Sequence, residues 1–246
     1  MSGELKKAQN PKRLWFLTVK NLKTMFRDRV QWVWLLGYPL LFIVVFSVAF
    51  GEGAYAVMAP ALVLSGPPVL ISQLASHFAE ENELGTIRRL ATTPVSRRSI
   101  LLSGMVSQLV VGSIQIVLLL VLSLAFGAFF HPQANIGLLF LIPFLFCFTS
   151  LGFGLLLASF VKTANSAGGL AWFLILPLQF LGGVFAQDPV ITVLPTSFAV
   201  NAMRQVMTNG VSSLGVIGLD LIGIIIWGVG TTILGIILFQ RKSAIL

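Results

Sequence analysis

Charged residues are scarce in this sequence. They make up 10% of its 246 residues, whereas a soluble domain carries about 25%. A water-soluble fold with so few charges would expose a mostly apolar surface and aggregate, so a soluble enzyme and a nucleic-acid-binding module are excluded. Intrinsic disorder needs low hydrophobicity and is excluded too, because 57% of the residues are hydrophobic and the mean hydropathy is +0.95. The class that remains is an integral membrane protein.

Catalytic and metal-binding motifs are also missing from the sequence. It has no G-x-x-x-x-G-K-[ST] phosphate loop, no cluster of His and Cys, and no G-x-S-G signature of an intramembrane protease. The single cysteine, Cys147, has no partner for an internal disulfide and lies in an apolar run, as a small buried residue would. We therefore expect no enzyme active site, no metal site and no cofactor bound by this chain.

Long apolar runs predict an all-α membrane protein with six transmembrane helices. A helix needs about 20 apolar residues to cross the hydrocarbon layer, and the runs are continuous, without the alternation of a β-barrel strand. The predicted spans are 30–50, 54–78, 100–129, 136–161, 167–185 and 214–239. They divide the chain into a cytoplasmic N-terminal region, 1–29, and a six-span domain, 30–246.

The distribution of basic residues predicts the orientation. Of the 16 Lys and Arg residues, all except Arg204 fall on one side of the predicted spans. Loops rich in Lys and Arg face the cytoplasm, so we expect both termini to be cytoplasmic, in a multi-pass protein of the plasma membrane. The net charge of +8 is explained by this bias without a nucleic-acid partner.

The segment 11–29 predicts an amphipathic helix that lies in the membrane interface. Its apolar face carries Trp15, Val19, Leu22 and Phe26, spaced four, three and four residues apart, and lysines lie opposite. Such a helix is either an anchor that fixes the tilt of the first span or an element that transmits motion.

The segment 79–99, between the second and third spans, predicts a docking element. Three acidic residues precede a short helix with an apolar ridge, which Pro94 ends, and four arginines follow the acids, two before Pro94 and two after it. A solvated cytoplasmic loop would explain the arginines, but not the acids or the ridge. A small amphipathic helix of this kind fits a groove on a cytosolic partner.

At this segment the chain resembles a known family. The pattern Glu81-x-Glu83-x-Gly85-Thr86-Ile87-x-x-Leu90-x-x-Thr93-Pro94-Val95-Ser96-Arg97 resembles the loop motif between the second and third spans of ABC-2 permeases, the membrane subunits of a class of ATP-binding-cassette transporters. The resemblance extends to the N-terminal helix, the six spans and the outer segment before the last span. Asn82 and Arg88 depart from the common pattern, which has an arginine and an acid there, so ion pairing with a partner would differ in detail.

The resemblance implies partners and contact residues. The segment would be a coupling helix that docks into a separate nucleotide-binding ATPase subunit, and ATP and Mg would be bound by that subunit. Two such subunits and a second permease copy, identical or related, would complete the transporter in the lipid bilayer. The implied ATPase contacts are Glu81, Glu83, Gly85, Thr86, Arg88, Arg89 and Leu90.

Aromatic residues and prolines in the spans give candidates for a substrate path. These are Phe42, Phe46, Phe50, Pro67, Trp172 and Phe180, although contact with lipid or other helices would explain such aromatics as well. The outer segment 186–213, with a predicted helix over 197–208, resembles the re-entrant segment that caps the outer end of the path in ABC-2 permeases. The candidate residues for an outer gate are Phe185, at the end of the fifth predicted span, and Asp188 and Arg204 in this segment.

The function predicted from these features is that of the membrane subunit of an ATP-driven exporter. The cores of the first five spans contain no acidic or basic residue, which disfavours an ion-driven carrier. Short outer loops and an apolar interior favour a hydrophobic or amphipathic substrate, such as a drug-like molecule or lipid. The alternatives are a polysaccharide or glycolipid permease of the same family, and an ATP-independent carrier or scaffold.

Overall fold

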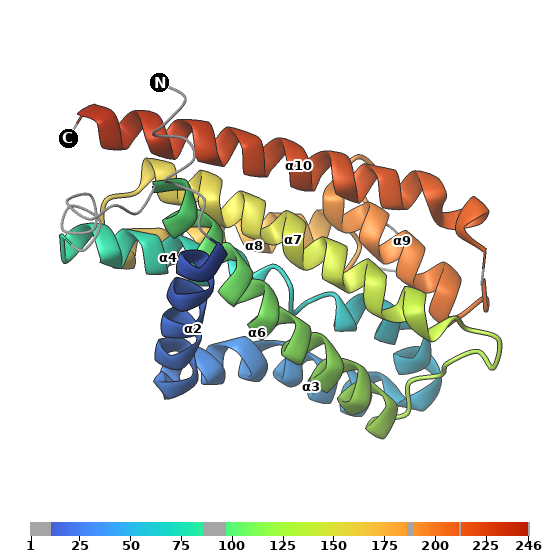
Figure 1. Cartoon of the computed structure of the whole chain (residues 1–246). Coiled ribbons are helices and arrows are strands. Elements are labelled where there is room, and N and C mark those ends of the chain that lie inside the picture. Colours follow the sequence, from blue (N-terminus) through green and yellow to red (C-terminus); the bar gives the residue numbers. More distant parts are fainter. Residues whose placement is uncertain (1–10, 86–96, 186–188, 212, 246) are drawn as a thin grey trace.

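The described part of the protein is built from α-helices. The computed structural model describes residues 11–85, 97–185, 189–211 and 213–245, and within these ranges no strand occurs. The helices are α2 (Pro11–Arg27), α3 (Arg29–Val63), α4 (Val69–Glu83), α6 (Arg97–Ala125), α7 (Ile136–Phe160), α8 (Ala164–Leu181), α9 (Pro195–Met207) and α10 (Leu214–Ile245). Figure 1 shows α7 lying alongside α10, with α2 crossing their direction near one end of the molecule.

Five helical segments of the described residues are long and apolar enough to cross a membrane. They are Arg29–Gly51, Ser99–Ala125, Ile136–Phe160, Ala164–Leu181 and Leu214–Phe239. They match five of the six predicted spans within a few residues. The fifth starts earlier than predicted, at Ala164, because the hydroxyl of Thr163 caps the helix by accepting a hydrogen bond from the Ser166 amide at 3.2 Å.

The second predicted span, 54–78, is not one continuous helix. It consists of the end of α3 and most of α4, separated by a non-helical break at 64–68. The break contains Gly66, Pro67 and Pro68, and proline cannot donate the backbone hydrogen bond that would continue a helix. All residues from 59 to 71 are buried, so protein and not lipid surrounds this irregular backbone.

Helix α3 turns sharply at Gly51. This residue has φ 73° and ψ 172°, a left-handed conformation that glycine adopts without a steric penalty. Two helical stretches therefore meet here, where the sequence predicted a short outer loop. Figure 1 shows the chain reversing at this point, so that 54–63 runs back beside the first stretch of α3.

Small residues bring α7 close to its neighbours. A Cβ atom on Gly154 would lie 3.0 Å from the carbonyl oxygen of Ile71 in α4, and one on Gly235 of α10 would lie 2.9 Å from the amide nitrogen of Leu156. Ser150 and Ala158, which share the stripe with Gly154, are buried. The stripe is therefore a packing surface between helices.

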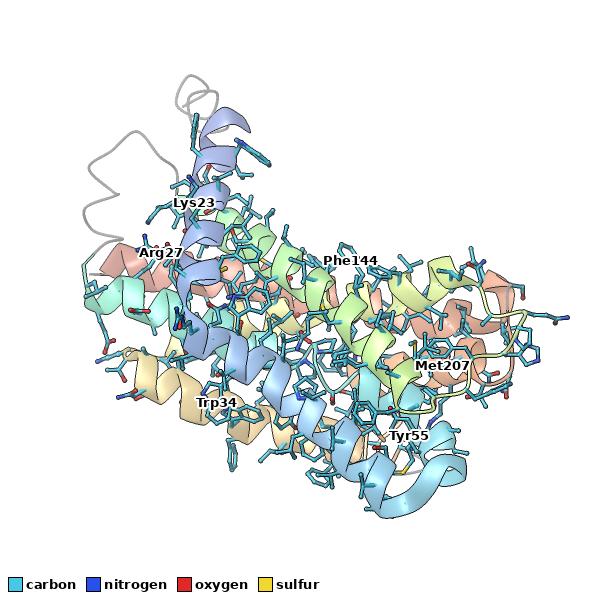
Figure 2. All side chains as sticks on the ribbon, turned by 90° about the horizontal axis from the view of Figure 1, so that it is seen from below. Lys23, Arg27, Trp34, Tyr55, Phe144 and Met207 are labelled. Atoms are coloured by element: carbon cyan, nitrogen blue, oxygen red, sulfur yellow. The ribbon has the colours of Figure 1, made fainter. Side chains whose placement is uncertain are left out.

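Helix α2 packs on α6 with a different face from the one that the periodicity selected. Thr18, Asn21 and Met25 are buried, and the hydroxyl of Ser107 donates a hydrogen bond to the Thr18 carbonyl at 3.2 Å. Trp15 and Phe26 remain exposed, and Val19 and Leu22 are half-buried. The apolar face of the predicted interface helix is thus directed largely away from the protein, while Lys23 and Arg27 lie on α2 at the end of the molecule opposite Met207 (Figure 2).

Candidate functional site

The acidic residues of the predicted coupling segment belong to the end of α4. The helix continues to Glu83 and is closed by Leu84, whose amide donates to the Glu80 carbonyl at 2.9 Å. Gly85 follows with φ 67°, as is common just after a helix end. Glu80, Glu81 and Glu83 therefore belong to the last turn of α4, which continues past residue 78, the predicted end of the second span. The short helix predicted after them falls mostly outside the described residues.

The last turn of α4 is bonded to the first turn of α8. The Glu83 carboxylate accepts a hydrogen bond from the Ala164 amide at 3.3 Å, and the Ser76 hydroxyl donates to the Ala164 carbonyl at 3.4 Å. A carboxylate at a helix N-terminus interacts favourably with the helix dipole and accepts a hydrogen bond from an amide that has no intrahelical partner. Thus α4 holds the beginning of α8 through two bonds to one residue.

The remaining predicted contact residues lie only partly within the described structure. One carboxylate oxygen of Glu81 is buried without a hydrogen-bond partner among the described residues. Thr86, Arg88, Arg89 and Leu90 lie outside the described residues, so their placement stays a prediction.

Aromatic rings from α3 and α8 meet in a continuous row. At its start, the ring centroids of Trp34 and Trp172 are 6.5 Å apart. The ring of Tyr38 lies 4.8 Å from Trp172 and 4.9 Å from Phe42, both in edge-on geometry. Such arrangements are the favoured ones for aromatic pairs. We call this row the aromatic seam.

Phe185, just beyond α8, extends the seam toward Gly51. Its ring centroid is 4.5 Å from Phe42, 6.1 Å from Phe46 and 5.0 Å from Phe180. Phe46 in turn lies 5.2 Å from Phe50. The structure therefore brings together five of the six candidate path residues and one candidate gate residue.

The sixth path candidate, Pro67, lies apart from the seam, in the buried break between α3 and α4. Sequence analysis missed Trp34 and Tyr38, although a spacing of four residues connects them to Phe42 and would have placed all three on one helical face.

Two buried glutamines hold the irregular backbone, and sequence analysis missed both. Gln179 of α8 donates to the Ser65 carbonyl in the break at 3.0 Å and accepts from the Tyr38 hydroxyl at 2.8 Å. Gln115 of α6 donates to the Leu35 carbonyl, which Pro39 leaves without its usual helical donor. Glutamine in an apolar run is the sequence signal that could have found them, because a buried amide needs partners.

The outer segment is tied to its neighbours at both ends of α9. Before α9, the Trp227 indole of α10 donates to the Val193 carbonyl at 2.9 Å. At its end, the Met207 carbonyl accepts from the His131 amide at 2.9 Å. The guanidinium of Arg204 donates to the Gly183 carbonyl at 3.2 Å, whereas Asp188 lies outside the described residues.

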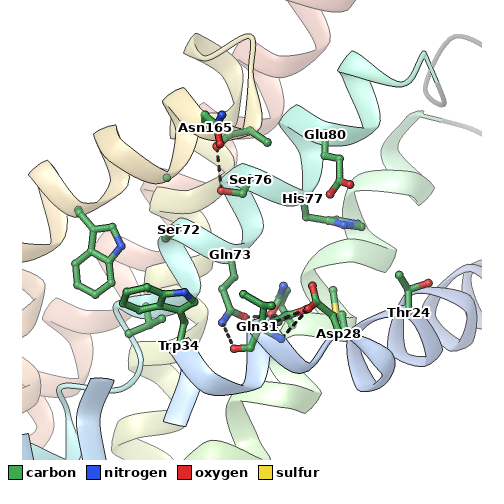
Figure 3. A pocket seen from close by; sticks show the side chains of 17 residues that line it. Thr24, Asp28, Gln31, Trp34, Ser72, Gln73, Ser76, His77, Glu80 and Asn165 are labelled. Atoms are coloured by element: carbon green, nitrogen blue, oxygen red, sulfur yellow. Dashed lines mark hydrogen bonds between the residues drawn. The ribbon is translucent and has the colours of Figure 1, made fainter. Parts of the chain in front are cut away.

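A pocket of about 480 Å³ opens where the junction of α2 and α3 meets α4 and α8. Figure 3 shows Asp28, Gln31 and Trp34 on one side, and Gln73, His77 and Glu80 of α4 on the other. The side-chain amide of Gln31 donates to that of Gln73 at 2.8 Å and bridges the two helices. Trp172 completes the lining from α8, so the pocket adjoins the start of the aromatic seam. No sequence pattern predicted this pocket.

Comparison with known proteins places this arrangement in a family. A family model described as ABC-2 type transporter matches residues 12–208, which cover the described helices from the second residue of α2 to the end of α9. A search of curated proteins found no match.

Proposed function

The chain belongs to the ABC-2 type transporter family, and from this premise we propose that it is the membrane subunit of an ATP-driven exporter. Family membership and the apolar helices make it a multi-pass membrane protein with a permease domain. The proposal adds that it works with two separate ATPase subunits, which bind ATP and Mg, and with a second permease copy. In this proposal the protein lies in the plasma membrane and both of its termini face the cytoplasm.

The proposed topology has six crossings, with the broken segment 54–83 as the second. Its irregular backbone at 64–68 is tolerable at membrane depth because it is fully buried and bonded by Gln179. The outer segment is proposed to re-enter the membrane, since Val193 meets Trp227, well inside α10, while Met207 meets the loop between α6 and α7.

The observation that carries the proposal is the hydrogen bond that the Ala164 amide donates to the Glu83 carboxylate. The segment that resembles the ATPase-docking motif begins at Glu81, within the last turn of α4, and continues beyond Glu83, so force on that segment reaches the end of α4 first. The bonds of Glu83 and Ser76 then pass it to α8, which supplies Trp172 and Phe180 to the aromatic seam. We propose that ATP binding to the partner favours one arrangement of α4 and α8, and that hydrolysis returns the other.

The aromatic seam is the proposed wall of the substrate path. It joins the pocket to the outer segment and consists of aromatic rings whose polar groups are the Tyr38 hydroxyl and the indole N–H groups of Trp34 and Trp172. A wall of this kind fits a hydrophobic or amphipathic substrate, because apolar surface on both partners is removed from water. An exposed side of α3, which includes Val33, Leu41 and Val45, leaves room for the second permease copy.

Coexpression with a cognate ATPase subunit tests this proposal. We expect the two proteins to copurify, and the ATPase rate to rise in the complex. Glu83→Ala combined with Gly85→Pro should abolish that rise, because the first removes the bond to α8 and the second cannot adopt the positive φ. Asp220→Asn, in α10, is the matched control and should leave the rise intact.

Transport at the full rate without nucleotide would refute the proposal and favour an ATP-independent carrier. Normal stimulation in the Glu83/Gly85 variant would refute the role given to the end of α4.

A further inference from the structure

We propose that the pocket between the α2–α3 junction, α4 and α8 binds an organic cation that carries an aromatic ring. Binding of the cation is a property of this chain alone. That the bound cation is the transported substrate, loaded from the cytoplasmic side, rests on the function proposed above.

The pocket is acidic within a basic part of the protein. Asp28 and Glu80 line it, and none of the described lining residues is a lysine or arginine. The chain as a whole has a net charge of +8, and Lys20, Lys23 and Arg27 lie exposed on the adjacent α2. Two carboxylates in a partly enclosed space favour a cation and disfavour an anion, such as the headgroup of an acidic lipid.

The two ends of the pocket differ in chemistry. Figure 3 shows Asp28, His77 and Glu80 gathered toward one end and Trp34 at the other, with Gln31 and Gln73 between them. The indole rings of Trp34 and Trp172 stand 6.5 Å apart at an angle of 58°. Tryptophan faces attract cations and stack on aromatic rings, so a ligand with a charge and an aromatic body satisfies both ends.

An unused polar side chain also points to a ligand here. Gln108 of α6 lines the pocket and is 1% exposed, yet neither its amide nitrogen nor its amide oxygen has a hydrogen-bond partner in the described structure. The Nε2 atom of His77 is likewise buried without a partner. Buried polar atoms in proteins are nearly always paired, so a group entering the pocket is the natural partner for both.

The size and position of the pocket agree with this role. Its volume of about 480 Å³ lies within the range of small-molecule sites. Because Trp34 and Trp172 also begin the aromatic seam, a ligand stacked on them already touches the proposed path.

Two probes of the same shape and opposite charge test the inference without any variant. Tetraphenylphosphonium and tetraphenylborate are titrated separately into the purified chain in a neutral detergent and followed by calorimetry, with protein-free micelles as the blank. We expect saturable binding of the cation, at least tenfold tighter than that of the anion. Equal or tighter binding of the anion would overturn the inference.

Variants then locate the binding. Glu80→Gln and Asp28→Asn should each weaken cation binding about tenfold, since each removes one attractive charge. The asparagine keeps the oxygen that caps α3, where Asp28 accepts from the Val30 and Gln31 amides. Asp220→Asn removes a carboxylate outside the pocket and should bind as the unaltered chain does. Unchanged affinity in a folded double variant, or an equal loss in the control, would overturn the assignment.

The outcomes separate this inference from the proposed function. Selective cation binding by a chain that never stimulates an ATPase would support the pocket and refute the exporter. ATPase stimulation by a chain that lacks charge-selective binding would support the exporter and refute the cation-binding pocket.

Discussion

Replacing Gln179 by leucine is the most direct test of how this fold tolerates a broken helix in its interior. Gln179 is fully buried and joins the Ser65 carbonyl in the break to the Tyr38 hydroxyl of α3. Leucine has a similar size, so the substitution removes two hydrogen bonds with little change in packing. It leaves the buried Ser65 carbonyl and the hydroxyl of the half-buried Tyr38 without their partner.

The expected loss follows from these two groups. A buried polar group left without a partner costs about 1–3 kcal/mol, whereas hydrogen bonds between membrane helices average about 0.6 kcal/mol. We expect Gln179→Leu to lower the free energy of unfolding by about 2 kcal/mol. Tyr38→Phe alone should cost about 1 kcal/mol, and the double variant less than the sum, because the orphaned hydroxyl is gone.

Unfolding in mixed micelles of a mild detergent and dodecyl sulfate, followed by circular dichroism, measures these free energies. Gln133→Leu, at an exposed glutamine, controls for the substitution itself. A loss below about 0.5 kcal/mol for Gln179→Leu, or costs that add within about 0.3 kcal/mol, would refute the reasoning.

Two further predictions concern the helix contacts. Gly154→Ala should lower the unfolding temperature, because the added Cβ would lie 3.0 Å from the Ile71 carbonyl oxygen. Gly169→Ala, with nothing within 4 Å of its Cβ, should leave the unfolding temperature equal or higher. Equal effects of the two substitutions in a thermal scan would contradict the close approach of α7 and α4. Thr163→Ala should lower the free energy of unfolding by about 1 kcal/mol, because it removes the cap of α8, whereas Thr163→Ser should retain most of that stability. Identical unfolding free energies for the two variants would contradict the capping role.

Much of this architecture could be predicted from the sequence, because an apolar run long enough to cross a bilayer is compatible with few structures other than a transmembrane helix. The five long helices were predicted within a few residues, and a helix was placed over 197–208, where α9 lies. Local chemistry set these bounds: Thr163 begins α8, and Pro195 occupies the first turn of α9.

The features that sequence analysis missed depend on contacts between distant residues. The break at 64–68 could not be predicted, because its Ser65 carbonyl is hydrogen-bonded by Gln179, more than 100 residues away in the sequence. The face of α2 that packs on α6 includes Thr18 and Asn21, which a search for apolar periodicity passes over. The pocket combines residues from five helices, and the residues from any one helix form no motif alone.

The bonds of α8 have a mechanical consequence. It is fastened near one end to Glu83 and near the other to Ser65, so α8 and the segment before and after the break are displaced as one rigid body. The rings of α3, by contrast, contact Trp172 of α8 edge-on through Tyr38, and contact Phe185, just beyond α8, at a tilt through Phe42. Ring contacts of this kind contain no hydrogen bond that must break when the two surfaces slide past one another. Within the described ranges, two hydrogen bonds between side chains link the two sides of this row of rings, Gln31 to Gln73 and Tyr38 to Gln179. Both would have to break if the two sides slid past one another.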